Sequence, residues 1–187
     1  MFSRTSPNLA PPTKMLHDIA DTLLTAVQEI GYLGLFFATF LENIIPPIPS
    51  ELIMPFGGYL ASTGRLNLVG AMLIATLGSL CGTLPYYFLG RVLHKKKVLR
   101  RAEKYGKFFL IGRKTAEDAF QLFEKNGKRI VFFSRFVPGA RGLVSLPAGS
   151  ANMNFLQFFL YTFAGTFIRA ALLTGIGYYL GQNREKI

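Results

Sequence analysis

Residues that support covalent cross-linking or metal binding are scarce in this chain of 187 residues. It has one cysteine, Cys81, so it cannot form an internal disulfide. No Cys–His spacing typical of a metal site occurs, and no cluster of Asp, Glu and His is visible. Tryptophan is absent, although phenylalanine occurs 18 times. The sequence therefore predicts neither a cofactor nor a bound metal.

Charge is almost absent from two long stretches, residues 66–90 and 155–181. The first stretch has no charged residue, and the second has only Arg169. A helix of about 20 apolar residues spans a bilayer. The alternative is two buried helices in a soluble core, but 187 residues cannot surround two helices of this length. With 50% hydrophobic residues and a mean hydropathy of +0.32, the chain is predicted to be an all-α multi-pass membrane protein.

The net charge of +11 is concentrated in residues 91–114, which contain ten Lys or Arg and one acid, Glu103. A basic segment beside a spanning helix usually marks the cytoplasmic side and attracts anionic lipid head groups. A nucleic-acid surface is the alternative, but the adjoining hydrophobic span makes it unnecessary. Residues 1–14 are predicted to be a disordered tail without the apolar run of a signal peptide. Residues 15–187 are predicted to form a single membrane domain.

The chain contains the same pattern twice, with an offset of 92 residues. The matching positions are Pro46 and Pro138, Pro55 and Pro147, Gly57 and Gly149, Tyr86 and Tyr178, and Tyr87 and Tyr179. Upstream, after a gap of four residues, Gly31 and Phe36-Phe37 correspond to Gly127 and Phe132-Phe133. The pattern predicts a first repeat at 15–90 and a second at 115–181, joined by the basic cytoplasmic loop 91–114.

Each repeat is predicted to contain four parts: an amphipathic surface helix, a short apolar arm, a hairpin rich in Pro and Gly, and a long transmembrane helix. The surface helices are expected at 16–29 and 115–126, the arms at 30–41 and 130–137, and the hairpins at 44–60 and 137–151. Proline breaks helices, and the freed carbonyls are tolerated in lipid only where protein or water meets them. We therefore expect re-entrant hairpins formed by Pro46, Pro49, Pro55, Gly57, Pro138, Gly139, Pro147 and Gly149.

Kinked spanning helices are the alternative to these hairpins. If only residues 66–90 cross between the hairpins, the hairpins open on opposite faces of the membrane. That arrangement is the inverted repeat found in transporters, whose sites lie between broken helices near the midplane.

Four charged residues fall within the apolar arms and hairpins: Glu42, Glu51, Arg135 and Arg141. A charge at the centre of a membrane helix costs at least about 2.5–3.5 kcal/mol, so each is a candidate functional residue. Arginine matches the geometry of phosphate, which predicts that the two arginines bind an anionic head group. A carboxyl group in low-dielectric surroundings can exchange protons near neutral pH, which predicts that the two glutamates couple to protons or sodium.

The alternative is two structural ion pairs that hold the hairpins together. Arg169 is a lesser candidate, which either faces the same cavity or extends along the span toward water. Asn43, Asn152 and Asn154 are candidates for hydrogen bonds at the hairpin rims, or for helix caps.

Two segments carry a resemblance to a known family. Residues 40–51, Phe-Leu-Glu-Asn-Ile-Ile-Pro-Pro-Ile-Pro-Ser-Glu, followed by Pro55-Phe-Gly-Gly, resemble the first signature of the DedA family, within the VTT or SNARE-associated domain superfamily. Residues 133–141, Phe-Ser-Arg-Phe-Val-Pro-Gly-Ala-Arg, with Leu146-Pro-Ala-Gly, are similar to its second signature.

This resemblance implies a bacterial cytoplasmic (inner) membrane protein with opposed re-entrant hairpins. Members of the family are linked to moving lipids between leaflets, including undecaprenyl phosphate and phosphatidylethanolamine. The family's membrane-embedded acids fall on Glu42 and Glu51, and its paired arginines on Arg135 and Arg141.

The hypothesis is therefore a translocase that moves an anionic or phosphate-bearing lipid, undecaprenyl phosphate or a phospholipid, between leaflets with proton or sodium coupling. Its partners are membrane lipids and the coupling ion, with no nucleic acid, and a homo-oligomer is compatible with the sequence. The alternatives are a small-solute or ion transporter on the same scaffold and a passive phospholipid scramblase. A lipid phosphatase fits poorly, because His17 and His94 both lie outside the hairpins.

Overall fold

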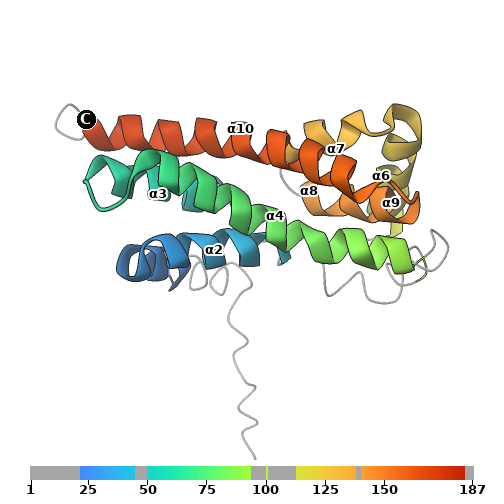
Figure 1. The fold of residues 1–187 in the computed structure, drawn as a ribbon, viewed down its shortest axis with the longest axis horizontal. Helices are drawn as coiled ribbons and strands as arrows, with labels where there is room; N and C mark the ends of the chain where they lie inside the picture. Colours follow the sequence, from blue (N-terminus) through green and yellow to red (C-terminus); the bar gives the residue numbers. More distant parts are fainter. Residues whose placement is uncertain (1–21, 45–49, 94–99, 101–112, 138–139, 184–187) are drawn as a thin grey trace, which may run out of the picture.

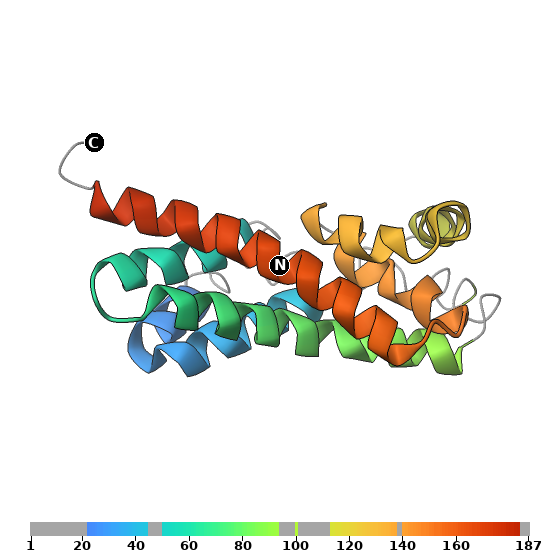
Figure 2. The same ribbon diagram turned by 45° about the horizontal axis from the view of Figure 1, so that its top comes forward.

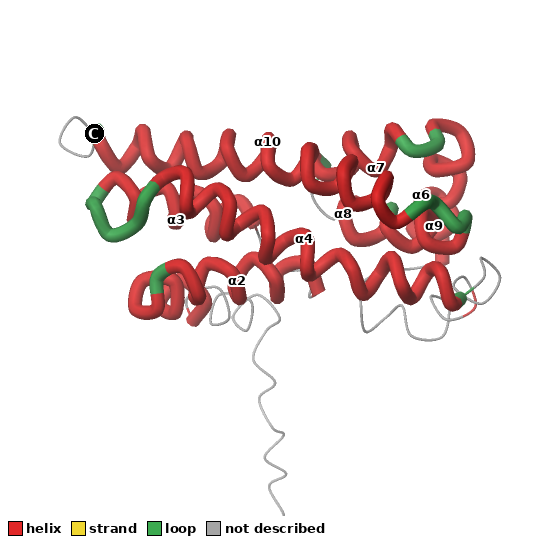
Figure 3. The backbone as a smooth tube through the Cα atoms, in the orientation of Figure 1, coloured by secondary structure: helices red, strands yellow, loops and turns green. Residues whose placement is uncertain are grey.

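The computed structural model describes residues 22–44, 50–93, 100, 113–137 and 140–183, and no strand occurs among them (Figure 3). Residues 22–30 are helical, so the described part of the predicted helix at 16–29 is confirmed. The other helices are α2 (Tyr32–Ile44), α3 (Ser50–Ser62), α4 (Leu68–Val92), α6 (Arg113–Asn126), α7 (Arg129–Phe133), η1 (Ser134–Phe136), α8 (Ala140–Leu143), α9 (Ser145–Ser150) and α10 (Phe155–Gln182).

The two long apolar helices predicted at residues 66–90 and 155–181 are confirmed as α4 and α10. With 25 and 28 residues, they are about 38 and 42 Å long. Both are long and apolar enough to cross a membrane. They run in opposite directions along the molecule (Figure 1), and α10 slants across α4 (Figure 2).

The shorter helices lie at the two ends of this long pair. Figure 1 shows α2 and α3 along one half of the molecule and α6 to α9 along the other. The 13 residues of α2 give a length of about 20 Å, roughly two thirds of the hydrocarbon core. The second arm is shorter, because α7 continues directly into η1 and stops at Phe136. Neither arm is long enough to cross a bilayer alone.

Two prolines expected to break helices lie inside them. Pro147 is the third residue of α9, where the missing N–H has no intrahelical partner to lose. Pro55 lies within α3, and the helix continues past it. The described interruption is at Val137, which is extended (φ −97°, ψ 118°) after η1. Pro46, Pro49, Pro138 and Gly139 lie outside the described residues.

The two halves of the chain, residues 22–93 and 113–183, contain the same glycine turn after their first helix. Gly31 and Gly127 both have positive φ, +64° and +58°, and each donates its N–H to the carbonyl four residues earlier, at 3.0 and 2.7 Å. A residue with a side chain would be strained there. The phenylalanines that follow meet edge to face in both halves, Phe36 with Phe37 at 5.6 Å and Phe132 with Phe133 at 5.3 Å.

The short helices pack on the long helix of the opposite half, α3 on α10 and α9 on α4. Glycines mark both crossings, and a Cβ at any of them would collide with backbone of the partner helix: Gly58 with Thr174, Gly149 with Tyr87, Gly177 with Pro55, and Gly90 with Leu146. Small residues allow helices in a membrane to approach closely in this way.

The glycine contacts of the first half match those of the second when residue numbers are raised by a fixed amount. The shift is 91 in the short helices, from Gly58 to Gly149, and 87 in the long helices, from Gly90 to Gly177. The caps Asn67 and Asn154 follow the shift of 87 too. These shifts differ from the 92 residues of the sequence pattern, so Tyr86-Tyr87 is not equivalent to Tyr178-Tyr179 in the long helices, nor Pro55 and Gly57 to Pro147 and Gly149 in the short ones. The register changes because nine residues separate Gly58 from Leu68 at the start of α4, and only five separate Gly149 from Phe155 at the start of α10.

Large apolar side chains remain exposed along both long helices. They include Leu73 and Leu77 on α4, and Leu160, Leu172 and Ile176 on α10. Exposed apolar surface of this extent is unfavourable in water. It fits helices that contact lipid on their outer faces.

Candidate functional site

The first arm, α2, meets α8, the short helix that follows the second arm, near the middle of the long helices. A narrow polar crevice lies at this junction. It is too narrow in this structure to hold a water molecule, and it is lined by Asn43, Ser79, Arg135, Arg141, Thr166 and Arg169. Of these, the sequence predicted Arg135 and Arg141, with Asn43 and Arg169 as lesser candidates.

Glu42 and Arg141 form an ion pair across the two halves of the chain. Glu42 lies in the last turn of α2 and Arg141 in α8. The side chain of Glu42 is fully buried, and that of Arg141 is 11% exposed. Separating two such charges inside a protein is strongly unfavourable. This ion pair therefore holds the end of α2 against α8.

Arg169 and Glu51 form a second pair between the halves. The Nη2 atom of Arg169, halfway along α10, donates to Oε1 of Glu51 at 3.0 Å. The Glu51 side chain is 47% exposed, so one side of this pair faces outward. Arg169 also lines the crevice.

Arg135 is buried and serves mainly as a hydrogen-bond donor to neutral oxygens. Its Nε donates to the Val131 carbonyl at 3.2 Å and its Nη1 to the Arg141 carbonyl at 2.9 Å. Its Nη2 donates to the hydroxyls of Ser145 and Thr162 at 3.1 and 3.2 Å. No carboxylate pairs with Arg135 in the part of the chain that the structure describes. It thus holds η1, α8 and α10 together while keeping its charge beside the crevice.

Three polar atoms at the crevice have no hydrogen-bond partner among the described residues. They are Oδ1 of Asn43, Oγ of Ser79 and Nη1 of Arg141. Buried polar groups are nearly always satisfied by protein or water. These donors and acceptors are therefore the groups at the junction that the described residues leave without a hydrogen bond.

The described charges at the junction do not balance. Three guanidinium groups (Arg135, Arg141, Arg169) face two carboxylates (Glu42, Glu51), which leaves one positive charge in excess. An uncompensated positive charge away from water favours an anion. Arginine presents planar, bidentate donors that suit a phosphate group.

Three further residues were missed by sequence reasoning. Thr166 lies three residues before Arg169 on the same face of α10, a spacing that was available as a signal. Ser79 occupies the matching position of α4 at the shift of 87, but serines are too common in apolar helices to stand out. Tyr86 donates its hydroxyl to the Ile44 carbonyl at 2.8 Å and so fixes the end of α2.

The remaining candidates lie away from the crevice. Asn154 caps α10 by accepting from the Leu156 N–H, and Asn152 adopts a positive φ of 52° in the preceding turn. Gly57 lies against the side chain of Leu35. His17 and His94 lie outside the described residues, within which no group of three His, Cys, Asp or Glu is close enough to hold a metal ion.

This arrangement is that of a helical membrane protein in which charged side chains meet at the ends of short helices and are surrounded by apolar helices. Residues 45–179 match the VTT domain. The chain belongs to the DedA/VTT family of membrane proteins. No solved structure shows a significant match to it.

The chain is similar to several curated bacterial proteins. It is 38% identical to an alkaline phosphatase-like protein of Lactococcus lactis, over 89% of this chain and 78% of that protein. It is 32% identical to undecaprenyl phosphate transporter A of Staphylococcus aureus, over 76% and 70% of the two chains. It is 27% identical to protein DedA of Escherichia coli, over 85% and 74%.

Proposed function

We propose that this protein moves a lipid with an anionic phosphate head group, undecaprenyl phosphate or a phospholipid, between the leaflets of the bacterial cytoplasmic membrane. The central observation is the crevice at which three arginines outnumber two glutamates, beside polar atoms that have no hydrogen-bond partner among the described residues. A lipid tail stays in the bilayer during transfer, so only the head group needs polar contacts. The name of the transporter from Staphylococcus aureus supports this class of substrate.

Arg141 is the best placed residue to bind the phosphate. Its Nη1 has no hydrogen-bond partner among the described residues, while its other terminal nitrogen pairs with Glu42. Arg135 contributes positive charge, but its donors are used within the protein. Arg169 adds a third positive charge at the crevice and is paired there with Glu51.

We also propose that the two halves form an inverted repeat with opposed re-entrant hairpins. The matching glycine turns and the exchanged crossings of α3 and α9 support a common scaffold. The opposite directions of α4 and α10 (Figure 1) support its inversion. Two such hairpins shorten the distance that a head group must travel through the apolar layer.

Proton or sodium coupling through Glu42 and Glu51 completes the proposal. Protonation of either carboxyl removes its charge and releases its arginine, so the ion pairs and the phosphate compete for the same guanidinium groups. A transporter is favoured over a phosphatase, because relatives in Staphylococcus aureus and Bacillus subtilis carry the name undecaprenyl phosphate transporter A.

Reconstitution into liposomes tests the function directly. Head-group-labelled polyprenyl phosphate, phosphatidylglycerol and phosphatidylethanolamine are supplied in separate preparations, and the exposed fraction in each leaflet is measured over time. Arg141→Lys should slow transfer of the accepted lipid about tenfold or more, since Lys keeps a charge but loses the planar fork. Arg65→Lys, at an exposed position in the turn before α4, is the control.

Two results would contradict parts of the proposal. Transfer of no phosphate-bearing lipid above the rate in protein-free liposomes would reject the function. Transfer by the wild-type protein that is unaffected by pH, a proton gradient or sodium would reject the coupling and indicate a passive scramblase.

A further inference from the structure

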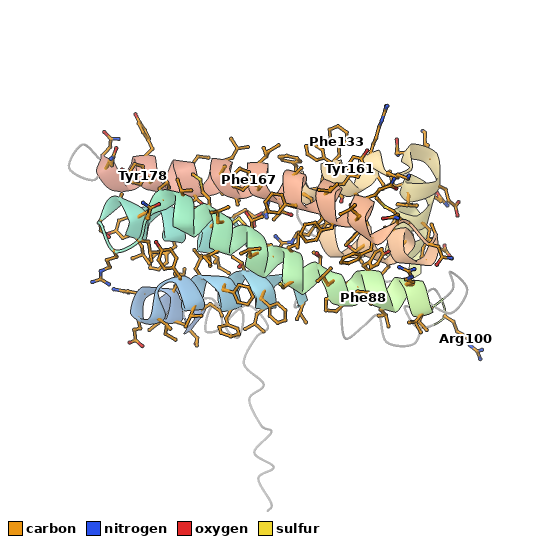
Figure 4. All side chains as sticks on the ribbon, in the orientation of Figure 1. Phe88, Arg100, Phe133, Tyr161, Phe167 and Tyr178 are labelled. Carbon is orange, nitrogen blue, oxygen red and sulfur yellow. The ribbon has the colours of Figure 1, made fainter. Side chains whose placement is uncertain are left out.

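A second, open pocket lies between the end of α6, the start of α7 and the first part of α10. Its volume is about 630 Å³, large enough for a small-molecule ligand. Lys125, Lys128 and Arg129 line it together with the aromatic side chains of Phe133 and Tyr161. Figure 4 shows these two aromatic residues close together at the edge of the molecule.

The backbone brings the three cations around one sharp turn. Gly127, with its positive φ of +58°, ends α6, and α7 begins two residues later. Lys125 is in the last turn of α6, and Lys128 and Arg129 begin the next segment. All three side chains are exposed.

These three cations have no acidic partner within the described part of the protein. No ion pair there includes Lys125, Lys128 or Arg129. A cluster of three like charges is unfavourable without a counter-charge. The pocket therefore presents positive charge that attracts an anion.

The equivalent turn in the first half, at Gly31, forms without these cations. At the matching positions of the first half, shifted by 96, the residues are Glu29, Tyr32 and Leu33 in place of Lys125, Lys128 and Arg129. Phe37 matches Phe133, so the aromatic residue is kept while the cations are not. The basic pocket is thus a property of one end of the molecule, the end at which α4 finishes (Figure 1).

We propose that this pocket binds the phosphate head group of an anionic phospholipid in the leaflet at that end, separately from the central crevice. Lys125, Lys128 and Arg129 contact the phosphate, and Phe133 and Tyr161 contact the glycerol and upper acyl chains. Both aromatic residues are exposed, at 60% and 37%, and tyrosine favours the membrane interface. A lipid is preferred to a soluble phosphate because an exposed apolar wall adjoins the cations.

The test measures binding of fluorescent phosphatidylglycerol to the purified full-length protein in detergent, with phosphatidylcholine as the comparison lipid. The triple variant Lys125→Gln, Lys128→Gln, Arg129→Gln should weaken phosphatidylglycerol binding about tenfold or more. The matched control is Arg65→Gln, Arg100→Gln, Lys114→Gln, which removes three exposed cations elsewhere and should change binding less than about twofold. The double variant Phe133→Ala, Tyr161→Ala should also weaken binding of the lipid, because it removes the apolar wall of the pocket. Glycerol phosphate, which has no acyl chains, should bind neither the wild-type protein nor this variant.

Three outcomes would overturn the proposal. Equal losses in the two triple variants would show diffuse attraction by net charge. Competition by glycerol phosphate as effective as that by the lipid would identify a soluble phosphate ligand. Loss of binding in Arg141→Lys, with the pocket variant unaffected, would place the lipid at the central crevice and leave the proposed function intact.

Discussion

Glu42 and Arg141 illustrate how single residues define this site. Each lies in an apolar segment where a lone charge is unfavourable, and together they form a buried pair between the two halves. Removing one partner leaves the other buried without compensation, whereas removing both removes the charge altogether. Stability and transport therefore depend on this pair in different ways.

A double-mutant cycle separates the two roles. Glu42→Gln and Arg141→Gln should each lower the free energy of unfolding by about 3–5 kcal/mol, because each leaves one buried charge. The combined variant should recover at least half of that loss and still fail to transport lipid. Thermal unfolding in detergent gives the stability terms, and liposome transfer gives the activity. A double variant that regains transport would make the pair purely structural.

At the scale of helices, close crossings at glycine position the arms. Gly78 of α4 lies against Phe36 and Thr39, and Gly165 of α10 lies against Phe132 and Arg135. The same crossing is thus built twice, with Thr39 in one half where Arg135 stands in the other. The scaffold is shared, and the charges distinguish the halves.

Substitutions at Gly58 and Gly149 test these crossings. Alanine at either position should lower the free energy of unfolding by about 1–3 kcal/mol, since the added Cβ meets rigid backbone of α10 or α4. Gly175→Ala is the control, because a Cβ there meets nothing within 4 Å and alanine favours the helix by up to about 1 kcal/mol. Thermal midpoints in detergent measure all three. Equal midpoints for Gly58→Ala, Gly149→Ala and Gly175→Ala would show that the crossings are looser than described.

For the whole molecule, the antiparallel α4 and α10 place equivalent turns at opposite ends. The turn from α3 into α4 lies at one end and the turn from α9 into α10 at the other (Figure 1). Both turns are exposed, at Thr63 and Ala151. In an inverted repeat these turns face opposite sides of the membrane.

Single cysteines at these turns test that topology. In a Cys81→Ser background, Thr63→Cys and Ala151→Cys should react with a membrane-impermeant maleimide from opposite sides of right-side-out and inside-out vesicles. Ala151→Cys should be labelled from the cytoplasmic side, because α9 and α10 meet at the end where α4 leads into the basic segment 91–114. Labelling of both positions from the same side would reject the inverted arrangement.

Local patterns were sufficient to predict the main elements. The apolar runs predicted α4 and α10 within two residues at each end. Charges within apolar segments indicated Glu42, Glu51, Arg135 and Arg141. These predictions depend on the surrounding sequence alone, since the cost of a charge in lipid does not require knowledge of its neighbours.

Partnerships depended on packing between the two halves. Nothing in the spacing of Glu51 and Arg169 indicates that α3 packs on α10 and brings them within 3.0 Å. The packing of η1 against α8 and α10 decides that Arg135 donates to neutral oxygens, while Arg141 keeps one terminal nitrogen without a hydrogen-bond partner among the described residues. The sequence by itself determined which charged groups lie in apolar segments, where burial is unfavourable. Tertiary structure decided which of them neutralise one another and which remain available to a ligand, because that choice depends on distances set by helix packing.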